Sequence, residues 1–288
     1  MTIDKKIGLI AGAGAFPLMF AREARNLGYA VFVIGLKDIT PKEIEAYAAA
    51  AEYFKLGQIS GPIDFLKKAG VDKVLMAGNV SHVSIFGGIM PDLRAARLLF
   101  TLKDRKANSL LGALADELKK DGIELVNSAT FLEHLMPAPG ILSGSRPDKD
   151  AAQNIESGWK AAKAIAGLDI GLTVVLKDRV VIAVEAQEGT DECIKRAGAL
   201  LRAGGAQAGK QLPGLAVVKV ARPDQDMRFD LPVIGVTTLE SMREAGAAIL
   251  AIEAGKTLIL DKEIFLTKAA EYGITVTAIE PAEFDRGS

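Results

Sequence analysis

The sequence is poor in the residues that build metal clusters and covalent crosslinks. Its 288 residues include one cysteine, Cys193, and two histidines. A single cysteine excludes an intramolecular disulfide and any site that needs several thiolates, and two histidines leave little material for a histidine cluster. A disulfide-stapled domain and a metal site built from several cysteines are therefore excluded, and a histidine cluster is not expected.

An excess of charge of one sign and a long apolar run are also absent. Lys+Arg 35 and Asp+Glu 36 give a formal net charge of −1, so no positive surplus exists to neutralise nucleic-acid phosphates. Hydrophobic residues make up 49% of the chain, but no apolar stretch reaches the roughly 18–20 residues that span a bilayer. The first residues lead into an apolar strand rather than a signal peptide. We expect a cytoplasmic globular protein that does not bind nucleic acid.

The first half of the chain alternates short β-branched runs with helical patterns, which is typical of a parallel sheet covered by helices. At about 150 residues per domain, the length favours two domains. We predict an α/β fold with a Rossmann-like parallel-sheet N-terminal domain. The expected strands are 7–10, 30–34, 53–56, 73–76 and 123–126, and the expected helices are 17–27, 41–51, 62–69 and two more after Pro91.

Residues 136–147 hold three prolines, two glycines and two serines, so we expect regular structure to lapse there. The domain boundary is placed in this segment, which gives a nucleotide-binding domain over 1–137 and a catalytic, lipid-substrate domain over 138–288. The second domain is predicted to be mixed α/β. Its expected elements are helices at 150–166, 190–201 and 261–272, a hairpin of 173–176 with 180–185, and strands at 215–220, 233–236, 248–252 and 274–278.

Two glycine-containing segments follow predicted strands of the first domain. Gly12-Ala13-Gly14-Ala15-Phe16-Pro17 stands between a strand and a helix, where glycines let a phosphate approach the free N–H groups of the helix. Pro17 occupies the place of the third glycine of a dinucleotide fingerprint, which favours nucleotide-phosphate contact over a dinucleotide site. Gly78-Asn79 follows strand 73–76 at the edge where open sheets bind ligands. Simple packing turns remain an alternative for both segments.

Two polar segments of the second half are further candidates. In Glu188-Gly189-Thr190-Asp191, helix capping explains Thr190 and Asp191, whereas Glu188 could meet a metal or a substrate hydroxyl. The segment 219–232 carries Asp224, Asp226 and Asp230 among lysine, arginine and glutamine side chains. A solvated loop would also be mixed in charge. Carboxylates without histidine nevertheless suit Mg²⁺ or Mn²⁺, and arginines suit phosphate.

Four motifs together resemble the LpxI family of UDP-2,3-diacylglucosamine pyrophosphatases, which act in lipid A biosynthesis. They are GAGAFP, MAGN, AVEAQEGTD and KVARPDQDMRFDLPVIG, and the resemblance spans nearly the whole chain. It implies a Mg²⁺-assisted hydrolase that cleaves the diphosphate of UDP-2,3-diacylglucosamine by attack of water on the α-phosphorus. The products would be UMP and 2,3-diacylglucosamine 1-phosphate (lipid X).

The resemblance also implies roles for individual residues. Asp226 would be the catalytic acid, acting as a metal ligand or orienting the attacking water, with Gln225 and Arg228 beside it and Asp230 as a second metal ligand. The residues expected to bind substrate are Gly12, Ala13, Gly14, Pro17, Gly78, Asn79, Glu188, Gly189, Thr190, Asp191 and Lys219.

Two other classes of function stay open. An NAD(P)-dependent oxidoreductase would bind its cofactor at the loop of Gly12 and Gly14. A non-catalytic nucleotide-sugar-binding protein would bind its ligand at the same place. The aspartate-rich loop favours phosphoryl chemistry, because hydride transfer does not need it. A lipid substrate further predicts peripheral contact with the inner face of the inner membrane, and a homodimer is left open.

Overall fold

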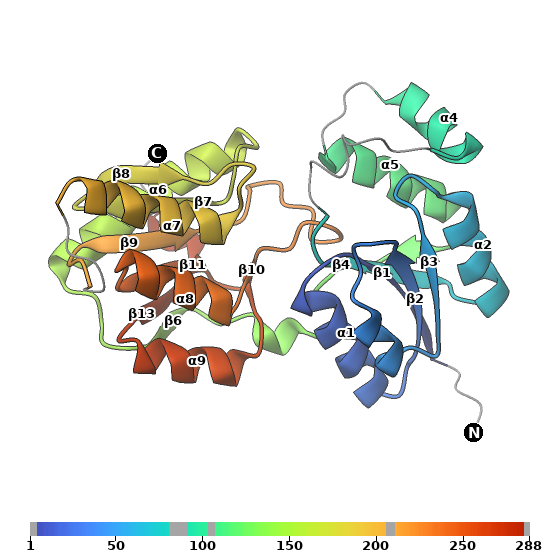
Figure 1. The fold of residues 1–288 in the computed structure, drawn as a ribbon, viewed down its shortest axis with the longest axis horizontal. Coiled ribbons are helices and arrows are strands. Elements are labelled where there is room, and N and C mark those ends of the chain that lie inside the picture. Colours follow the sequence, from blue (N-terminus) through green and yellow to red (C-terminus); the bar gives the residue numbers. More distant parts are fainter. Residues whose placement is uncertain (1–4, 81–90, 103–106, 206–210, 285–288) are drawn as a thin grey trace. The chain divides into compact units, whose positions relative to one another are not determined.

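The computed structural model describes residues 5–80, 91–102, 107–205 and 211–284, without the side chains of 107 and 108. The chain divides into two compact units (Figure 1). The first unit contains Met1–Leu132 together with Asp226–Asp230, and the second contains Glu133–Gln225 and Leu231–Ser288. The predicted boundary between 137 and 138 thus falls after the division at Leu132, and Asp226–Asp230, expected in the second domain, belong to the first unit.

The first unit is built on a five-stranded sheet in the order β3-β2-β1-β4-β5, in which every pair is parallel. The order reverses between β1 and β4, which makes the ends of these strands the topological switch point. The strands are β1 (Lys6–Ala11), β2 (Ala30–Leu36), β3 (Ala50–Phe54), β4 (Lys73–Ala77) and β5 (Glu124–Leu125). The helices are α1 (Ala15–Asn26), η1 (Lys42–Tyr47), α2 (Ser60–Ala69), α4 (Leu93–Thr101) and α5 (Ala107–Lys120).

Apolar side chains of α2 and α5 pack against the strands of this sheet. Ile63 and Leu66 of α2, Val74 of β4 and Leu118 of α5 belong to one buried cluster. Phe229 packs against the same cluster, which ties the segment Asp226–Asp230 to the first unit. The predicted Rossmann-like parallel sheet is confirmed.

The predicted helix at 41–51 is wrong. A short 3-10 helix ends at Tyr47, and Ala50–Phe54 forms β3 at the edge of the sheet, where Ala50 pairs with Phe32. The alanines and glutamates of this segment suit a helix, but hydrogen bonding to β2 outweighs that preference.

The second unit contains a six-stranded mixed sheet in the order β6-β13-β11-β9-β7-β8, which confirms the predicted mixed α/β half. Its central strands β9, β11 and β13 are parallel, whereas β6 and β7 run antiparallel to their neighbours. The strands are β6 (Gly140–Ser143), β7 (Thr173–Lys177), β8 (Val180–Val184), β9 (Leu215–Lys219), β11 (Ile249–Glu253) and β13 (Thr275–Ile279), with a separate pair of β10 (Val233–Ile234) and β12 (Leu258–Ile259). The helices are η2 (Glu133–Leu135), α6 (Lys149–Gly167), α7 (Thr190–Ala203), α8 (Val236–Ala245), α9 (Lys262–Glu271) and α10 (Pro281–Phe284).

Helices cover both faces of this sheet because successive strand residues point to opposite sides. On one face, Val174 and Leu176 pack in a cluster with Trp159 of α6. On the other, Val175 packs in a cluster with buried residues of α7, α8 and α9, which Figure 1 shows as a row of helices. Among the described helices, none is both long and apolar enough to cross a membrane.

Two expectations for the second half are corrected by the structure. The segment 136–147 is not wholly irregular, because Gly140–Ser143 forms β6 against β13. The strand expected at 233–236 ends at Ile234, and the helix α8 follows from Val236. Valine and two threonines at its start favour a strand, but Leu239 and Met242 are buried in the core and hold the segment as a helix.

Candidate functional site

The two glycine motifs of the first unit meet at its switch point. The N–H of Gly12 donates to the Ala77 carbonyl at 2.8 Å. The N–H of Ala13 donates to the Asn79 carbonyl at 2.8 Å, and the N–H of Asn79 donates back to Ala13 at 3.0 Å. The ends of β1 and β4 are therefore joined by a short antiparallel bridge, which brings together segments that are far apart in the sequence.

Glycine is required at positions 12 and 78 because the neighbouring backbone leaves no space for a Cβ atom. A Cβ at Gly12 would lie 2.7 Å from the Asn79 carbonyl oxygen. Gly78 has φ +93°, and a Cβ there would lie 2.6 Å from the Ala13 carbonyl oxygen. Close packing thus explains these two glycines without a ligand.

Gly14 differs from them because it faces open space. Its φ is +92°, and a Cβ would meet no described atom within 4 Å. It is the N-cap of α1 and offers no side-chain oxygen, and the first turn of α1 holds no acidic residue. The N–H groups at the start of α1 are thus available to an anion, and the buried Pro17 completes the turn.

The segment Asp226–Asp230 lies at the same edge of the sheet. The N–H of Ser128, which is 1% exposed, donates to the Met227 carbonyl at 2.8 Å. Its hydroxyl oxygen is 2.7 Å from the carbonyl oxygens of both Met76, in β4, and Arg228. Sequence reasoning missed Ser128, because nothing in its local sequence marks it.

Asp226 and Arg228 form a two-point ion pair. Arg228 Nε lies 2.9 Å from Asp226 Oδ1, and Nη2 lies 2.6 Å from Oδ2. The hydrogen bonds from Arg228 lower the pKa of the Asp226 carboxyl, although partial burial acts in the opposite direction. Asp226 therefore stays ionised to a lower pH than a free aspartate. The N–H of Asp230 donates to the Asp226 carbonyl at 3.1 Å, so the two expected metal ligands stand one turn apart.

The carboxylates of Asp226 and Asp230 limit the kind of metal site that this segment could form. The described part of the chain contains no group of three or more His, Cys, Asp or Glu side chains placed to hold an ion. Mg²⁺ often uses one or two carboxylates and completes its shell with water and substrate phosphates. Asp226 and Asp230 would supply at most two carboxylates to such an ion, and in the described part of the chain they do not form an all-protein cage.

In the second unit, Lys219 and Thr190 belong to one buried network with Glu185. Lys219 Nζ donates to Thr190 Oγ1 at 2.7 Å, and Thr190 Oγ1 donates to Glu185 Oε1 at 2.8 Å. Burial alone would raise the pKa of Glu185, but the charge of Lys219 and hydrogen bonds from Thr173, Thr190 and the Leu172 N–H outweigh it, so the pKa is lowered. Sequence reasoning missed Glu185, which directly follows β8 in the AVEAQEGTD motif.

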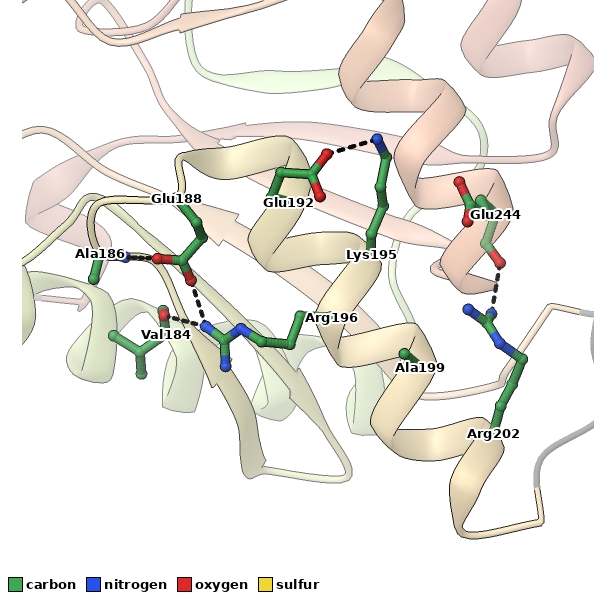
Figure 2. A pocket seen from close by; sticks show the side chains of 9 residues that line it. All are labelled: Val184, Ala186, Glu188, Glu192, Lys195, Arg196, Ala199, Arg202 and Glu244. Atoms are coloured by element: carbon green, nitrogen blue, oxygen red, sulfur yellow. Dashed lines mark hydrogen bonds and ion pairs between the residues drawn. The ribbon is translucent and has the colours of Figure 1, made fainter. Parts of the chain in front are cut away.

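Glu188 and Asp191 have other partners. Figure 2 shows Glu188 directed at Arg196, with Oε1 and Nη2 2.5 Å apart, while its other oxygen accepts from the Ala186 N–H at 3.1 Å. Asp191 accepts from Thr238 of α8 at 2.9 Å. Gly189 is the N-cap of α7, with φ +83°. These contacts explain Glu188 and Asp191 as holding the start of α7.

The depression drawn in Figure 2 has a volume of about 720 Å³ and lies along the outer side of α7. Glu188 pairs with Arg196, and Glu192 pairs with Lys195 at 2.8 Å. These charges are bonded to one another along an exposed helix. The depression therefore gives no support for a catalytic site.

Gln225 is the last residue of the second unit before the segment Asp226–Asp230, and it forms a turn with Arg222. Its side-chain oxygen accepts from the Arg222 N–H at 2.8 Å, and its own N–H donates to the Arg222 carbonyl at 3.3 Å. The Arg222 guanidinium pairs with Asp169. The amide of Gln225 thus shapes the backbone immediately before Asp226.

Comparison with known proteins identifies the family. The LpxI N-terminal domain matches residues 6–135, and the LpxI C-terminal domain matches residues 138–277. The chain belongs to the LpxI family. A curated relative, the UDP-2,3-diacylglucosamine pyrophosphatase LpxI of Caulobacter vibrioides, is 34% identical over 282 residues, which cover 97% of this chain and 99% of the relative.

Two solved structures resemble this chain weakly. N5-carboxyaminoimidazole synthetase from Staphylococcus aureus is 14% identical with a TM-score of 0.26, and the match covers 62% of this chain and 39% of that one. The N5-carboxyaminoimidazole ribonucleotide synthetase from Thermotoga maritima is 17% identical with a TM-score of 0.24, covering 64% and 42%. The chain spans less than half of either protein, and likeness at this level carries no argument about function.

Proposed function

We propose that this chain hydrolyses the diphosphate bond of UDP-2,3-diacylglucosamine to UMP and 2,3-diacylglucosamine 1-phosphate, a reaction of lipid A biosynthesis. The observation that carries the proposal is the placement of Asp226–Asp230. This segment is the most specific part of the family resemblance, and it packs at the sheet edge where Gly12–Gly14 and Gly78–Asn79 meet. The relative from Caulobacter vibrioides, matched along 99% of its length, supports the same reaction.

The switch point supplies groups suited to a nucleotide diphosphate. The N–H groups at the start of α1, which receive no side-chain cap from Gly14, suit phosphate oxygens, and in the described part of the chain Gly14 leaves room for a ligand against the backbone. Asn79 is exposed at the end of β4 and donates from its amide to a base or a sugar. Arg228 holds Asp226 through Nε and Nη2, and its guanidinium has further N–H donors that suit a phosphate oxygen.

Asp226 orients the attacking water in this proposal. Its carboxylate accepts a hydrogen bond from the water, and Arg228 keeps it ionised. A lowered pKa makes a carboxylate a weak general base at neutral pH, because its affinity for the proton is small. We therefore assign Asp226 to holding the water and a cation rather than to storing the proton.

Mg²⁺ would be held by Asp226 and Asp230 together with oxygens of the substrate. When bound, the ion neutralises phosphate oxygens and lowers the pKa of a coordinated water. The proposal predicts that EDTA removes activity and that added Mg²⁺ or Mn²⁺ restores it. Activity that survives complete chelation would remove the ion from the proposal.

Incubation of the purified chain with UDP-2,3-diacylglucosamine and Mg²⁺ in ¹⁸O-water tests the reaction directly. Appearance of UMP and the sugar 1-phosphate supports hydrolysis. The predicted attack on the α-phosphorus places the label in UMP, whereas label in 2,3-diacylglucosamine 1-phosphate would place the attack on the other phosphorus. Substrate binding without UMP would favour a non-catalytic binding protein, and binding of a nicotinamide cofactor without turnover would favour an oxidoreductase.

Cytoplasmic location, peripheral membrane contact and a homodimer stay predictions. Co-sedimentation with vesicles containing anionic lipid tests the membrane contact. Sedimentation equilibrium of the purified chain tests the dimer.

A further inference from the structure

The loop 126–132 of the first unit is anchored near both of its ends. The N–H of Val126 donates to the Val74 carbonyl of β4 at 2.8 Å, next to the pairing of β4 with β5. Near the other end, the Phe131 ring stacks on Phe20 of α1, with ring centres 5.8 Å apart. Phe131 has φ +70°, which is a strained backbone conformation for a bulky side chain. Such strain persists only where the surroundings hold the backbone, so this loop is a rigid support.

Ser128 lies in the middle of this loop and contacts two other segments. It is 1% exposed. Its N–H donates to the Met227 carbonyl at 2.8 Å, and its Oγ lies 2.7 Å from the carbonyl oxygens of both Met76 and Arg228. A serine hydroxyl carries one proton, so the two carbonyls share it. Ser128 thus joins the end of β4 to the segment Asp226–Asp230.

The contacts of Ser128 reach Asp226 through one neighbour. Arg228, whose carbonyl is bonded to Ser128, donates its own N–H to Asp226 Oδ1 at 3.1 Å and its Nε to the same oxygen at 2.9 Å. All three residues belong to the first unit. The direction of the Asp226 carboxylate therefore depends on the Arg228 backbone, and that backbone is bonded to Ser128.

Phe229 gives the same segment an apolar anchor. Its side chain packs against the buried cluster of α2, β4 and α5, and the Arg228 guanidinium lies 5.7 Å from its ring centre. Apolar burial keeps a segment near a surface but has no directional preference, whereas hydrogen bonds require defined distances and angles. The hydrogen bonds of Ser128 are therefore suited to fixing the orientation of the backbone at Met227 and Arg228.

We propose that Ser128 is a positioning residue, which fixes the backbone of Met227 and Arg228 and thereby aims the Asp226 carboxylate. The effect on rate rests on the proposed function. Ser128 itself touches no reacting atom in this proposal. Misplacement of a reacting group by about 1 Å can lower a rate by about 10²-fold, so loss of the hydroxyl is expected to act on kcat more than on KM.

Ser128→Ala removes the hydroxyl and keeps the backbone N–H bond to Met227. Ser143→Ala in β6 is the matched control, because Ser143 Oγ is also buried but has no hydrogen-bond partner among the described residues. Thr130→Val is a second control in the same loop, since Thr130 Oγ1 donates within the loop, to the Asn127 carbonyl at 2.6 Å.

The experiment measures UMP release, thermal unfolding and amide hydrogen exchange in the wild type and the three variants. We expect Ser128→Ala to unfold about 2–4 °C below the wild type. Its kcat is expected to fall by about 10- to 100-fold with KM within about threefold, and its amides over 227–230 to exchange faster. Ser143→Ala and Thr130→Val are expected to match the wild type in kcat and in exchange over 227–230.

A double-mutant cycle tests whether Ser128 acts through Asp226. In an Asp226→Asn background the carboxylate that Ser128 aims is already lost, so adding Ser128→Ala is expected to lower the remaining kcat by less than about twofold. A merely structural role for Ser128 would lower kcat by the same factor in both backgrounds. That outcome overturns the proposal.

A kcat within about twofold of the wild type in Ser128→Ala also overturns the proposal, because the hydroxyl is then irrelevant to rate. If Ser128→Ala does not fold, Ser128→Cys decides in its place. A thiol is a weak donor, so about a 3- to 10-fold loss in kcat is expected, and unchanged kcat and exchange overturn the proposal.

Failure of the proposed function can be told apart from failure of this inference. If the wild type itself releases no UMP, the proposed function fails. Hydrogen exchange then tests the role of Ser128 in holding the segment without any activity. Faster exchange over 227–230 in Ser128→Ala supports that role, and unchanged exchange overturns it.

Discussion

The polar groups at the carboxyl edges of the two sheets differ in their surroundings: those of the first unit are exposed or partly exposed, and those of the second are buried. At the first-unit edge, Gly14 and Asn79 are exposed, and Asp226 pairs with Arg228 at the surface. At the second-unit edge, Lys219 and Glu185 are buried and bonded within the unit. Groups that bind a ligand must exchange water for that ligand, whereas groups that hold a fold are satisfied internally. We therefore propose that ligand binds at the first edge, whereas the buried groups of the second edge are bonded within the fold.

The largest effect is expected for Lys219→Met at the buried edge. Removal of the lysine leaves Glu185 without its compensating charge, which is expected to lower the free energy of unfolding by about 3–5 kcal/mol. Urea unfolding at pH 8 measures the change. Lys195→Met, which breaks an exposed pair with Glu192, is expected to leave the free energy of unfolding unchanged. If Lys219→Met and Lys195→Met lower the free energy of unfolding equally, the buried edge has no special role in stability.

The same variant gives a pH dependence with a definite sign. In the wild type the pKa of Glu185 is lowered, so its contribution to stability is present above the unfolded pKa of about 4.3 and is lost as pH falls through the folded pKa. Without Lys219, burial raises the pKa of Glu185 instead. The deficit of the variant should then be larger at pH 8 than at pH 5, and a deficit independent of pH would contradict this explanation.

A smaller effect is expected for Gly12→Ala at the switch point. The added Cβ would lie 2.7 Å from the Asn79 carbonyl oxygen, so the bridge between β1 and β4 must shift. We expect a loss of about 1–3 kcal/mol in the free energy of unfolding, together with weaker binding of UMP measured by calorimetry. Gly112→Ala in α5 is the control, since a Cβ there meets none of the described atoms within 4 Å. If Gly12→Ala binds UMP as tightly as the wild type, the nucleotide does not bind at the switch point.

Arg228→Gln is expected to move the acidic limb of the kcat/KM profile. Arg228 lowers the pKa of Asp226, so its removal raises that pKa, and the ionised form is lost at a higher pH. The limb therefore shifts to higher pH, as measured by initial rates across a buffer series. A limb that stays in place would show that Asp226 does not govern the profile.

The smallest effect concerns Cys193. Burial raises the pKa of its thiol to about 12, so very little thiolate exists at pH 8. Iodoacetamide is expected to leave activity intact and to modify Cys193 only after unfolding in urea, as mass spectrometry would detect. Rapid alkylation of the folded chain would contradict its burial.

Local patterns predicted the parts of the fold and site that depend on local chemistry. The apolar runs at 7–10 and 73–76 indicated buried parallel strands. For the glycines at 12 and 78, the alternative of a packing turn matches the close backbone approach in the structure, whereas the expected ligand contact stays a prediction. The helix α8 was missed because its first residues favour a strand, and packing against the core decides its structure.

Contacts between distant residues could not be predicted in this way. Lys163 and Glu253 are 90 residues apart, and neither has a local sequence that marks a buried pair. Phe229 likewise gives no local sign that the segment Asp226–Asp230 packs with the first unit. The family resemblance singled out Asp226 through its motif, whereas no local pattern indicated the surface that holds it.

The central claim is that hydrolysis depends on Asp226, which lies at the carboxyl edge of the first-unit sheet. UMP release by Asp226→Asn, compared with Asp224→Asn in the same loop, tests it most directly, because Asp224 is exposed. We predict that Asp226→Asn folds like the wild type and loses about 10²-fold or more in kcat, roughly 3 kcal/mol of transition-state stabilisation, while Asp224→Asn stays within about threefold. A folded Asp226→Asn variant that releases UMP at the wild-type rate would contradict the claim.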